Sequence, residues 1–345
     1  MSAALGAARL ADAARPAGAR QPAWRRTVRA FAGSAALGAT LLITGCAGPA
    51  FDLQGHRGAR GLAPENTLAG FTRALETGVT TLELDIGVTR DGVVVVHHDE
   101  RLNPNIARNP SGAWVVAPTP LIRELTWEEV SAYNVGRIRP GTDYDKLFPD
   151  QTARDGEPIP RLADLFEMIR KRGDRRVRFS IETKLTPGKP DDTIGPEAMV
   201  AALLGVIATH GTESRVMIQS FDWRTLKLVQ ARAPRIPTVY LSAQRPNFNT
   251  IDVKGLWTAG LLRENFASIP AMVQAAGGAV WSPHFEELTR ELIADAHARS
   301  LKVIAWTVNK REDIGRMIEM GVDGLITDRP DLGQAVLKER GRAAR

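Results

Sequence analysis

The 345-residue chain has very little cysteine and few aromatic residues. Cys46 is its only cysteine, so the chain cannot form an internal disulfide or a thiolate cluster for a metal. Phe, Trp and Tyr together make up 6% of the residues, and the hydrophobic and charged fractions are ordinary for a soluble globular protein. A catalytic thiol could therefore come only from Cys46, and the position of this residue suggests another role.

The body of the chain also lacks a net charge. The formal net charge is +6, but residues 1–45 contain six Arg and one Asp and supply most of it. The remainder is close to neutral, whereas nucleic-acid binding usually requires a strongly basic face. We therefore expect no nucleic acid among the partners of this protein.

The N-terminal segment has the features of an export signal. Arg25, Arg26 and Arg29 precede an apolar run, 31–43, which has the length of a signal-peptide core and is too short to span a bilayer. The run ends Leu-Ile-Thr-Gly-Cys, which resembles a bacterial lipobox and implies cleavage before Cys46 and lipid attachment to its thiol. We expect a lipoprotein signal peptide over 1–45, a short linker over 46–51, and an exported protein anchored to the bacterial membrane by lipid on Cys46, at its periplasmic or extracellular face. The alternative is an ordinary signal peptide with an incidental cysteine.

From residue 52 to about residue 340, short β-rich runs alternate with longer amphipathic segments. This pattern predicts repeated βα units, and eight runs rich in Val, Ile and Leu predict an α/β fold of the TIM (β/α)₈ barrel type. An open doubly wound sheet is the alternative, but no glycine-rich phosphate fingerprint follows the first strand. The expected strands are 51–56, 81–86, 178–184, 216–221, 237–242, 279–283, 303–308 and 324–327.

Two segments depart from a plain barrel. Asp91-Gly92 is a hairpin turn signal, so we expect 93–98 to return antiparallel to the second strand, with position 85 opposite position 97. This inserted hairpin would bring His98 back to the end of that strand. A long insertion, about 101–160, is rich in Pro, Asn, Asp and Gly; we expect it over the C-terminal face of the barrel, with a helix near 126–133.

Polar side chains collect at the expected C-terminal ends of these strands, where catalytic groups of such barrels lie. Glu83 and Asp85 share one face of their strand, because alternate residues of a strand point the same way, and Glu182 and Lys184 do likewise. Three carboxylates favour a hard divalent cation such as Ca²⁺ or Mg²⁺. Together with Arg57, Lys184 supplies positive charge, so the site suits a phosphate group.

These residues belong to a series of ordered motifs that resembles the glycerophosphodiester phosphodiesterase family. The motifs are His56-Arg57-Gly58, Pro64-Glu65-Asn66-Thr67, Glu83-Leu84-Asp85, His98-Asp99, Glu182-Thr183-Lys184, Gln219-Ser220-Phe221 and Trp306-Thr307-Val308-Asn309. The Arg-Thr-Thr element that follows His-Asp in many members is absent, which indicates a distinct subgroup and leaves the substrate headgroup open.

The resemblance implies a role for each group of residues. It implies a TIM barrel with a divalent metal at Glu83, Asp85 and Glu182, and with catalytic histidines at His56 and His98. It also implies that Arg57 and Lys184 hold the phosphate and that Glu65 either lines the site or lies close to the metal. We include Gln219, Phe221 and Trp306 as substrate-binding candidates, although core packing also explains them.

The other histidines are weaker candidates. Strand alternation places His97 on the face opposite His98. We expect His210, His284 and His297 at the surface or at helix caps, with His284 the one that could line the pocket because it ends a strand. Pro64-Glu65-Asn66-Thr67 also predicts the start of a helix, capped by Asn66 or Thr67.

The expected function is metal-dependent hydrolysis of glycerophosphodiesters to sn-glycerol 3-phosphate and an alcohol. One histidine is expected to act as general base and the other as general acid, without an assignment of which does which. Two alternatives remain open: cleavage of lipid or lysolipid phosphodiesters in the manner of a phospholipase D, and an anchored phosphodiester-binding protein without catalysis. The sequence does not indicate an oligomeric state.

Overall fold

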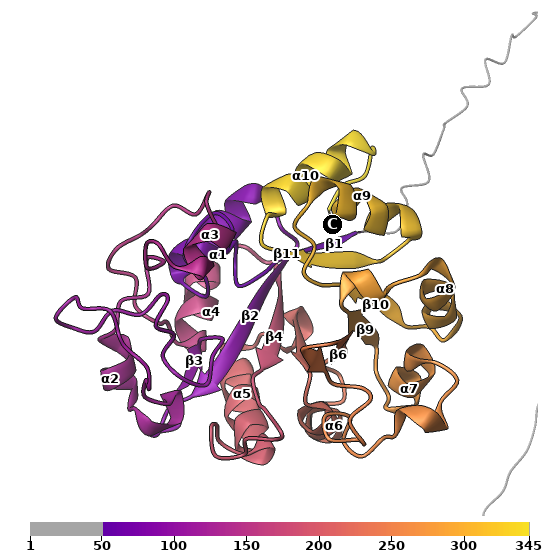
Figure 1. Cartoon of the computed structure of the whole chain (residues 1–345), viewed down its shortest axis with the longest axis horizontal. Helices are drawn as coiled ribbons and strands as arrows, with labels where there is room; N and C mark the ends of the chain where they lie inside the picture. Colours follow the sequence, from indigo (N-terminus) through magenta and orange to yellow (C-terminus); the bar gives the residue numbers. More distant parts are fainter. Residues whose placement is uncertain (1–50, 345) are drawn as a thin grey trace, which may run out of the picture. The chain divides into compact units, whose positions relative to one another are not determined.

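A computed structural model of the chain describes residues 51–344. Within them, eight parallel strands form a closed sheet, because β1 pairs with β2 on one side and with β11 on the other. The predicted barrel is thus confirmed (Figure 1). In order around the barrel its strands are β1 (Asp52–Gly55), β2 (Thr81–Val88), β4 (Arg178–Thr183), β5 (Val216–Ser220), β6 (Thr238–Ser242), β9 (Val280–Pro283), β10 (Lys302–Ala305) and β11 (Gly324–Thr327).

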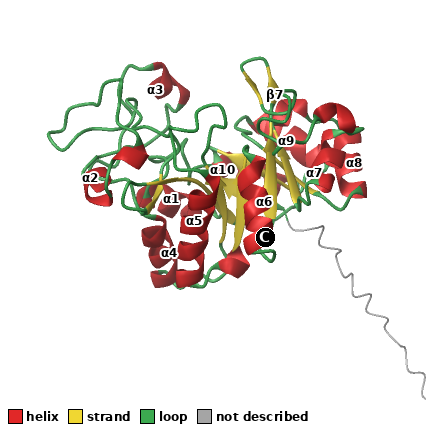
Figure 2. Cartoon of the chain, turned by 90° about the horizontal axis from the view of Figure 1, so that it is seen from below, coloured by secondary structure: helices red, strands yellow, loops and turns green. Residues whose placement is uncertain are grey.

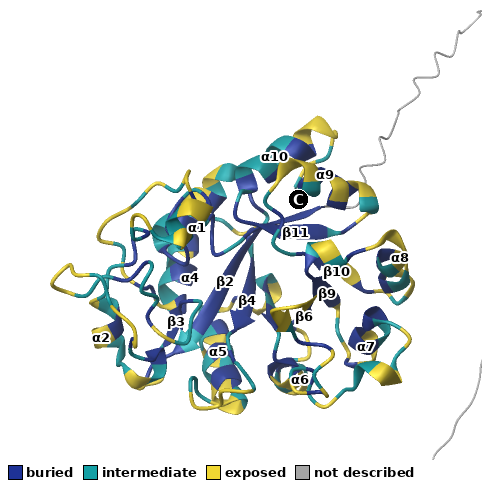
Figure 3. Cartoon of the chain, viewed as in Figure 1, coloured by how far each residue is buried: buried dark blue, intermediate teal, exposed yellow. Residues whose placement is uncertain are grey.

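Helices surround the barrel and bury one face each against it (Figure 3). The main core fills the space between the strands and these helices, and a small cluster of Val239, Val280, Ile304 and Ile326 fills the barrel interior. The sequence did not predict α7 or α10, both of which begin with a proline in the first turn. The helices are α1 (Leu68–Thr77), α4 (Leu162–Lys171), α5 (Pro196–His210), α6 (Trp223–Arg232), α7 (Ile269–Ala275), α8 (Arg290–Ala298), α9 (Arg311–Met320) and α10 (Pro330–Glu339).

The inserted hairpin is present in the expected register. β3 (Val94–Val96) runs antiparallel to β2, with Ile86 opposite Val96. The turn uses Gly92 at φ +82°, a conformation that glycine adopts without strain. One pair further along, the amide of His97 donates to the carbonyl of Asp85 at 3.0 Å, so positions 85 and 97 meet as predicted. His98 therefore follows directly at the end of the barrel.

The insertion 101–160 lies at the C-terminal end of the barrel. It contains η1 (Ile122–Glu124), α2 (Trp127–Ser131) within the expected helical segment, and α3 (Asp143–Leu147), and packs around its own small core. Figure 2 shows α3 at the same end as β7 (Gln244–Arg245), which follows β6 and pairs with β8 (Phe248–Asn249). The β7–β8 hairpin was not predicted.

In the described part of the chain, no helix combines the length and the apolar character that a membrane span requires. The expected signal peptide, Cys46 and most of the expected linker lie outside the described residues.

Candidate active site

A cavity of about 190 Å³ opens at the C-terminal ends of the strands, where the sequence placed the site. It brings together residues from seven of the eight barrel strands or the turns that follow them, and His98, which follows β3. Of the predicted site residues, all but Glu65 and Asp85 line it, and those two lie directly behind Arg57. The lining residues are His56, Arg57, Arg60, Glu83, His98, Glu182, Lys184, Gln219, Phe221, Leu241, Trp306, Thr307 and Ile326.

Glu83, Asp85 and Glu182 converge on one point. Strand alternation places Glu83 and Asp85 on the same face of β2, and the parallel register sets Asp85 beside Glu182 of β4. One oxygen of each carboxylate lies within 4.8 Å of the other two, and all three residues are buried. Asp85 Oδ1 has no hydrogen-bond partner among the described residues. Three buried carboxylates with an unpartnered oxygen fit a hard divalent cation, so these residues could hold one.

The electrostatics of the three carboxylates reflect their burial first and their mutual repulsion second. Burial, reinforced by the charge of Asp85, raises the pKa of Glu83 well above its ordinary value. Burial, against the opposing effect of Lys184, raises the pKa of Glu182 to about 7. Burial also disfavours the charge of Asp85, but His98, Arg57 and Lys184 outweigh it and hold the pKa of this carboxyl low. A divalent cation at this point would relieve the repulsion.

His56 follows β1 and is oriented by a buried carboxylate. Its Nδ1 lies 2.7 Å from Oδ1 of Asp328, which follows β11. Asp328 is itself held by Nε of Arg60 at 2.9 Å and by the side-chain amide of Asn309 at 2.6 Å. A proton on Nδ1 that donates to Asp328 leaves Nε2 of His56 as a proton acceptor. Burial and the charge of Arg60 lower the pKa of His56, with Asp328 opposing them.

His98 also has a carboxylate beside its Nδ1, but this carboxylate, of Asp99, is partly exposed. Its Nδ1 lies 2.7 Å from Oδ1 of Asp99, so its Nε2 is also left as an acceptor. Burial and the charges of Arg57 and Lys184 lower the pKa of His98 well below its ordinary value. Neighbouring His97 is buried, and its Nε2 lies 3.2 Å from the carbonyl of Arg101, where it supports the start of the insertion.

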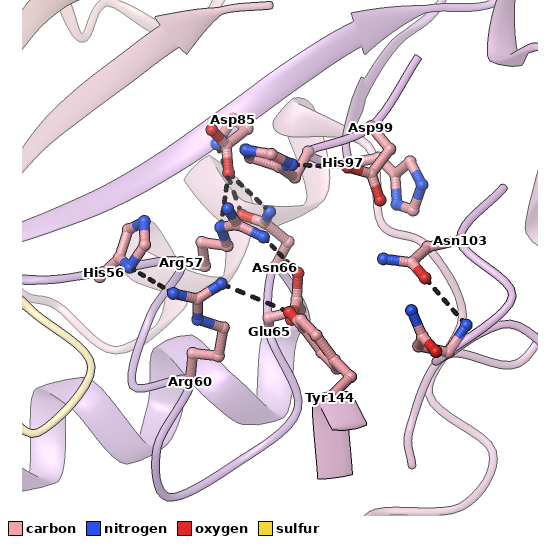
Figure 4. A network of polar contacts seen from close by, with 12 residues as sticks. His56, Arg57, Arg60, Glu65, Asn66, Asp85, His97, Asp99, Asn103 and Tyr144 are labelled. Carbon is pink, nitrogen blue, oxygen red and sulfur yellow. Dashed lines mark hydrogen bonds and ion pairs between the residues drawn. The ribbon is translucent and has the colours of Figure 1, made fainter. Parts of the chain in front are cut away.

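Arg57 links the turn after β1 to the carboxylates (Figure 4). Its backbone, at φ +50°, directs the amide to Oε2 of Glu83 at 2.8 Å. Its guanidinium donates to Glu65 at 2.7 Å and lies 3.4 Å from Asp85. Glu65 also accepts a hydrogen bond from the hydroxyl of Tyr144 on α3, so it orients Arg57 and stands apart from the three converging carboxylates.

The segment that follows Glu65 serves both the site and α1. The side-chain amide of Asn66 donates to Asp85 at 3.0 Å, which fixes one oxygen of that carboxylate. The hydroxyl of Thr67 accepts from the amide of Gly70 and caps α1. Of the two predicted capping residues, Thr67 is therefore the cap.

Lys184 and Gln219 contact the carboxylates directly. The ammonium of Lys184 donates to Glu182 at 2.8 Å, and the side-chain amide of Gln219 donates to Glu83 at 2.6 Å. Phe221 and Trp306 pack edge to face, with ring centroids 5.3 Å apart, and form an aromatic side of the cavity.

The remaining histidines lie away from the cavity lining. His284 packs against Trp306 and receives a hydrogen bond from Arg245 at 2.9 Å. His210 contacts the carbonyl of Val206, and His297 pairs with Asp323. His210 at the end of α5 and the exposed His297 agree with the expectation of surface and cap positions, whereas His284 is buried.

A family model for the glycerophosphoryl diester phosphodiesterase family matches residues 56–332, nearly the whole barrel. The chain belongs to this family. It is accordingly an enzyme, a phosphoric diester hydrolase. A glycerophosphodiester phosphodiesterase of Caldanaerobacter subterraneus is 30% identical over 280 residues, which cover 80% of this chain and 93% of that protein.

Solved structures agree with the family. A crystal structure from Silicibacter pomeroyi, assigned to the glycerophosphoryl diester phosphodiesterases, is 36% identical with a TM-score of 0.77, and the match covers 86% of this chain and 96% of that one. A phosphodiesterase of Oleispira antarctica, solved in complex with its product sn-glycerol-3-phosphate, has a TM-score of 0.61 at 22% identity and covers 84% of this chain and 97% of that one.

Three residues of this family member were missed at the level of sequence: Arg60, Tyr144 and Asp328. Asp328 had a usable signal, because it directly follows the last strand, where other polar site residues stand. Arg60 sits four residues after His56 in the same turn, which was a weaker signal. Tyr144 had none, since it comes from the irregular insertion and reaches Glu65 only through the tertiary fold.

Proposed function

We propose that this enzyme hydrolyses glycerophosphodiesters to sn-glycerol 3-phosphate and an alcohol. One observation carries the proposal: a single small cavity is lined by two histidines, His56 and His98, each with a carboxylate on Nδ1, beside three convergent buried carboxylates. The product named for the Oleispira antarctica structure, sn-glycerol-3-phosphate, supports the same substrate class.

The proposed reaction needs one proton acceptor and one proton donor. A water molecule or a hydroxyl of the substrate attacks phosphorus, and Nε2 of one histidine takes the proton from the attacking oxygen. The P–O bond to the leaving alcohol breaks, and the other histidine, protonated at Nε2, gives its proton to the departing oxygen. Attack by water gives sn-glycerol 3-phosphate directly. Attack by a substrate hydroxyl gives a cyclic glycerol phosphate, and water then opens this ring at phosphorus while the two histidines exchange their roles. Asp328 and Asp99 stabilise the imidazolium state of their respective histidines throughout the cycle.

Glu83, Asp85 and Glu182 are the residues that would hold a divalent cation, Ca²⁺ or Mg²⁺. When bound, such a cation neutralises the charge that develops on the phosphoryl group. Gln219 and Asn66 keep two of the carboxylates oriented, and Arg57 and Lys184 add positive charge on the side of the phosphate.

The size of the cavity favours a small substrate over a lipid. Its volume of about 190 Å³ is below the few hundred Å³ typical of sites that enclose drug-sized ligands. The insertion packs beside it through Tyr144, which contacts both Arg60 and Glu65. Cleavage of intact lipids in the manner of a phospholipase D is therefore the weaker alternative. Membership in a hydrolase family argues against a binding protein without catalysis.

We also propose that the enzyme is exported and anchored to the bacterial membrane through lipid on Cys46. The order of basic residues, short apolar run and cysteine in the N-terminal segment supports this. Stable anchoring takes more than one acyl chain or a second membrane-binding signal.

The test is hydrolysis of glycerophosphocholine and glycerophosphoethanolamine by protein that begins at Ala47, with and without a chelator. We expect release of glycerol phosphate that stops when the chelator is added and returns with Ca²⁺ or Mg²⁺. If no metal-dependent release occurs across a range of headgroups, the proposal is wrong.

Protein with His56→Ala or His98→Ala should keep its fold and lose most of its turnover. A near-normal kcat in either variant would contradict the roles proposed for the two histidines.

A further inference from the structure

The charges of the described residues are unevenly distributed along the barrel axis. Residues 51–344 contain 38 basic and 38 acidic side chains and thus no net formal charge. The N-terminal end of the barrel is formed by the segments that lead from each helix into the next strand, the first residues of the strands, and the segment after α10. These positions hold ten basic residues, namely Arg172, Arg175, Arg176, Arg178, Arg215, Arg235, Arg299, Lys302, Arg340 and Arg342, and four acidic ones, Asp52, Asp174, Glu213 and Asp323.

We call these fourteen residues the basic end; it carries a surplus of six positive charges. The rest of the described barrel must carry the opposite surplus, because the total is zero. Such an asymmetry creates a field that attracts an anionic partner to one end of the molecule.

Much of the positive charge at the basic end is unpaired. Arg172, Arg175 and Arg176 are exposed on the connection between α4 and β4, and within residues 51–344 none of them forms an ion pair. The same is true of exposed Arg235 and Lys302, which line a hollow of about 630 Å³ across this end. In the active-site cavity, by contrast, the three lining cations Arg57, Arg60 and Lys184 are all paired with carboxylates.

The position of β1 connects this surface to the proposed anchor. All barrel strands run in parallel, so β1 begins at the basic end, where the guanidinium of Arg342 lies over the ring of Phe51 at 5.9 Å. Cys46 precedes Phe51 by five residues. Because an extended chain covers at most about 3.6 Å per residue, lipid on Cys46 would lie within roughly 18 Å of this end.

We propose that the basic end is a docking surface for an anionic lipid bilayer, and that docking there turns the catalytic end away from the membrane. The orientation rests on the proposed anchor; the attraction to anionic lipid rests on the charges alone. Basic residues near such a surface strengthen a lipid anchor that is marginal by itself. The active site then opens to the aqueous phase, and its substrates are water-soluble diesters, consistent with a small cavity.

The first test measures the binding of protein that begins at Ala47 to vesicles. All strands and core residues of the barrel lie at or after Phe51, so this protein keeps the complete barrel. We expect it to bind vesicles of phosphatidylglycerol and phosphatidylcholine at low salt, to be released as salt rises, and to ignore vesicles of phosphatidylcholine alone. Equal binding to both kinds of vesicle, or preferential binding to duplex DNA or RNA at the same salt, would overturn the proposal.

A matched pair of variants locates the surface. Arg172→Glu/Arg175→Glu/Arg176→Glu should weaken vesicle binding at least about 100-fold, since each basic residue near an anionic surface contributes roughly fivefold. The control, Lys146→Glu/Lys189→Glu/Lys254→Glu, makes the same change of charge at exposed positions of the catalytic end and should bind much more tightly than the first variant. Equal losses in the two variants would show that the basic end has no special role.

The second test reports the orientation. Protein that begins at Ala47 contains no cysteine, so a fluorophore can be placed on Arg235→Cys at the basic end or on Lys189→Cys at the catalytic end. We expect only the label at 235 to shift its emission on anionic vesicles; a shift at 189 instead would overturn the proposal. Hydrolysis of soluble diesters by the same proteins is measured in parallel, so that loss of activity, which bears on the proposed function, is distinguished from loss of binding.

Discussion

The pairing of His56 with Asp328 and Arg60 sets the charge state of a histidine at the cavity. Asp328 favours the imidazolium and Arg60 opposes it, so two oppositely charged neighbours tune one proton equilibrium. Burial adds to the effect of Arg60, and the pKa of His56 falls below its ordinary value. The histidine is thus neutral near neutral pH, ready to accept a proton, until substrate with its negative charge arrives.

Arg60→Gln should therefore raise the pKa of His56. It removes a cation that disfavours the imidazolium, and it frees the charge of Asp328, which favours it. In the pH profile of kcat/KM, the limb that belongs to His56 moves to higher pH: the acidic limb if His56 is the base, the alkaline limb if it is the acid. The experiment thereby also assigns the roles. Arg73→Gln, an exposed change on α1, should leave both limbs in place, and a downward shift in Arg60→Gln would contradict this account.

At the scale of elements, two glycines allow α1 to pack against the catalytic turn. Gly58 has φ +90°, and a Cβ there would lie 2.8 Å from the carbonyl carbon of Gly70 in α1. The amide of Gly58 also donates to the carbonyl of Glu83 at 3.2 Å. The turn that carries His56 and Arg57 is thus fixed between the helix and β2.

Gly58→Ala should consequently destabilise the protein and distort the site. The left-handed backbone alone costs a residue with a Cβ about 1–2 kcal/mol, and the contact with Gly70 adds to it. Urea unfolding followed by circular dichroism measures the loss, and kcat/KM should fall with it. Gly188→Ala, in an exposed loop with no atom within 4 Å of the new Cβ, should match the unchanged protein. Equal stability of the two variants would refute the packing argument.

The insertion contributes to the site through α3. The hydroxyl of Tyr144 donates to Glu65, which in turn accepts from Arg57, and it lies 3.3 Å from the guanidinium of Arg60. Tyr144 therefore supports both arginines that lie beside the two histidines. Tyr144→Phe keeps the ring but leaves Glu65 short of a hydrogen bond, which for a charged group is worth roughly 1.5–3 kcal/mol. We expect a lower free energy of unfolding and a lower kcat/KM. Leu147→Ala, an exposed change on the same helix, should affect neither, and identical behaviour of the two variants would exclude a role for the insertion in the site.

The elements differ in how much of them could be predicted from the sequence. The barrel strands were predictable because burial on both faces leaves continuous apolar runs, and the hairpin because Asp91-Gly92 fixes both its turn and its register. The converging carboxylates were predictable because alternation and strand ends determine where side chains meet. Tyr144 and Arg60 were not, because their contacts with Glu65 and Asp328 depend on tertiary packing of an irregular insertion and of a turn, which no local period encodes.

For the whole molecule, the barrel separates two kinds of charge. At the C-terminal end, Glu83, Asp85 and Glu182 are buried together, and their repulsion is only partly offset by Arg57 and Lys184. At the N-terminal end, unpaired cations remain in contact with solvent. Burial of the three carboxylates lowers the stability of the barrel, and a small cation can restore it. The unpaired cations at the N-terminal end are free to attract a large anionic partner.

The stability of the whole barrel should therefore depend on divalent cations. An ion that binds only the folded state at 100 times its Kd stabilises that state by about 2.7 kcal/mol. For a barrel of this size, that corresponds to an increase in Tm on the order of 5 °C. Differential scanning fluorimetry with Ca²⁺, Mg²⁺ or a chelator measures this increase in Tm and ranks the two ions.

Asp85→Asn keeps the shape of the side chain but removes a central ligand, so the increase in Tm should vanish, whereas Glu76→Gln, an exposed change on α1, should retain it. An equal shift in Asp85→Asn would place the ion elsewhere on the protein, and no shift with either ion would mean that Arg57 and Lys184 already balance the three carboxylates.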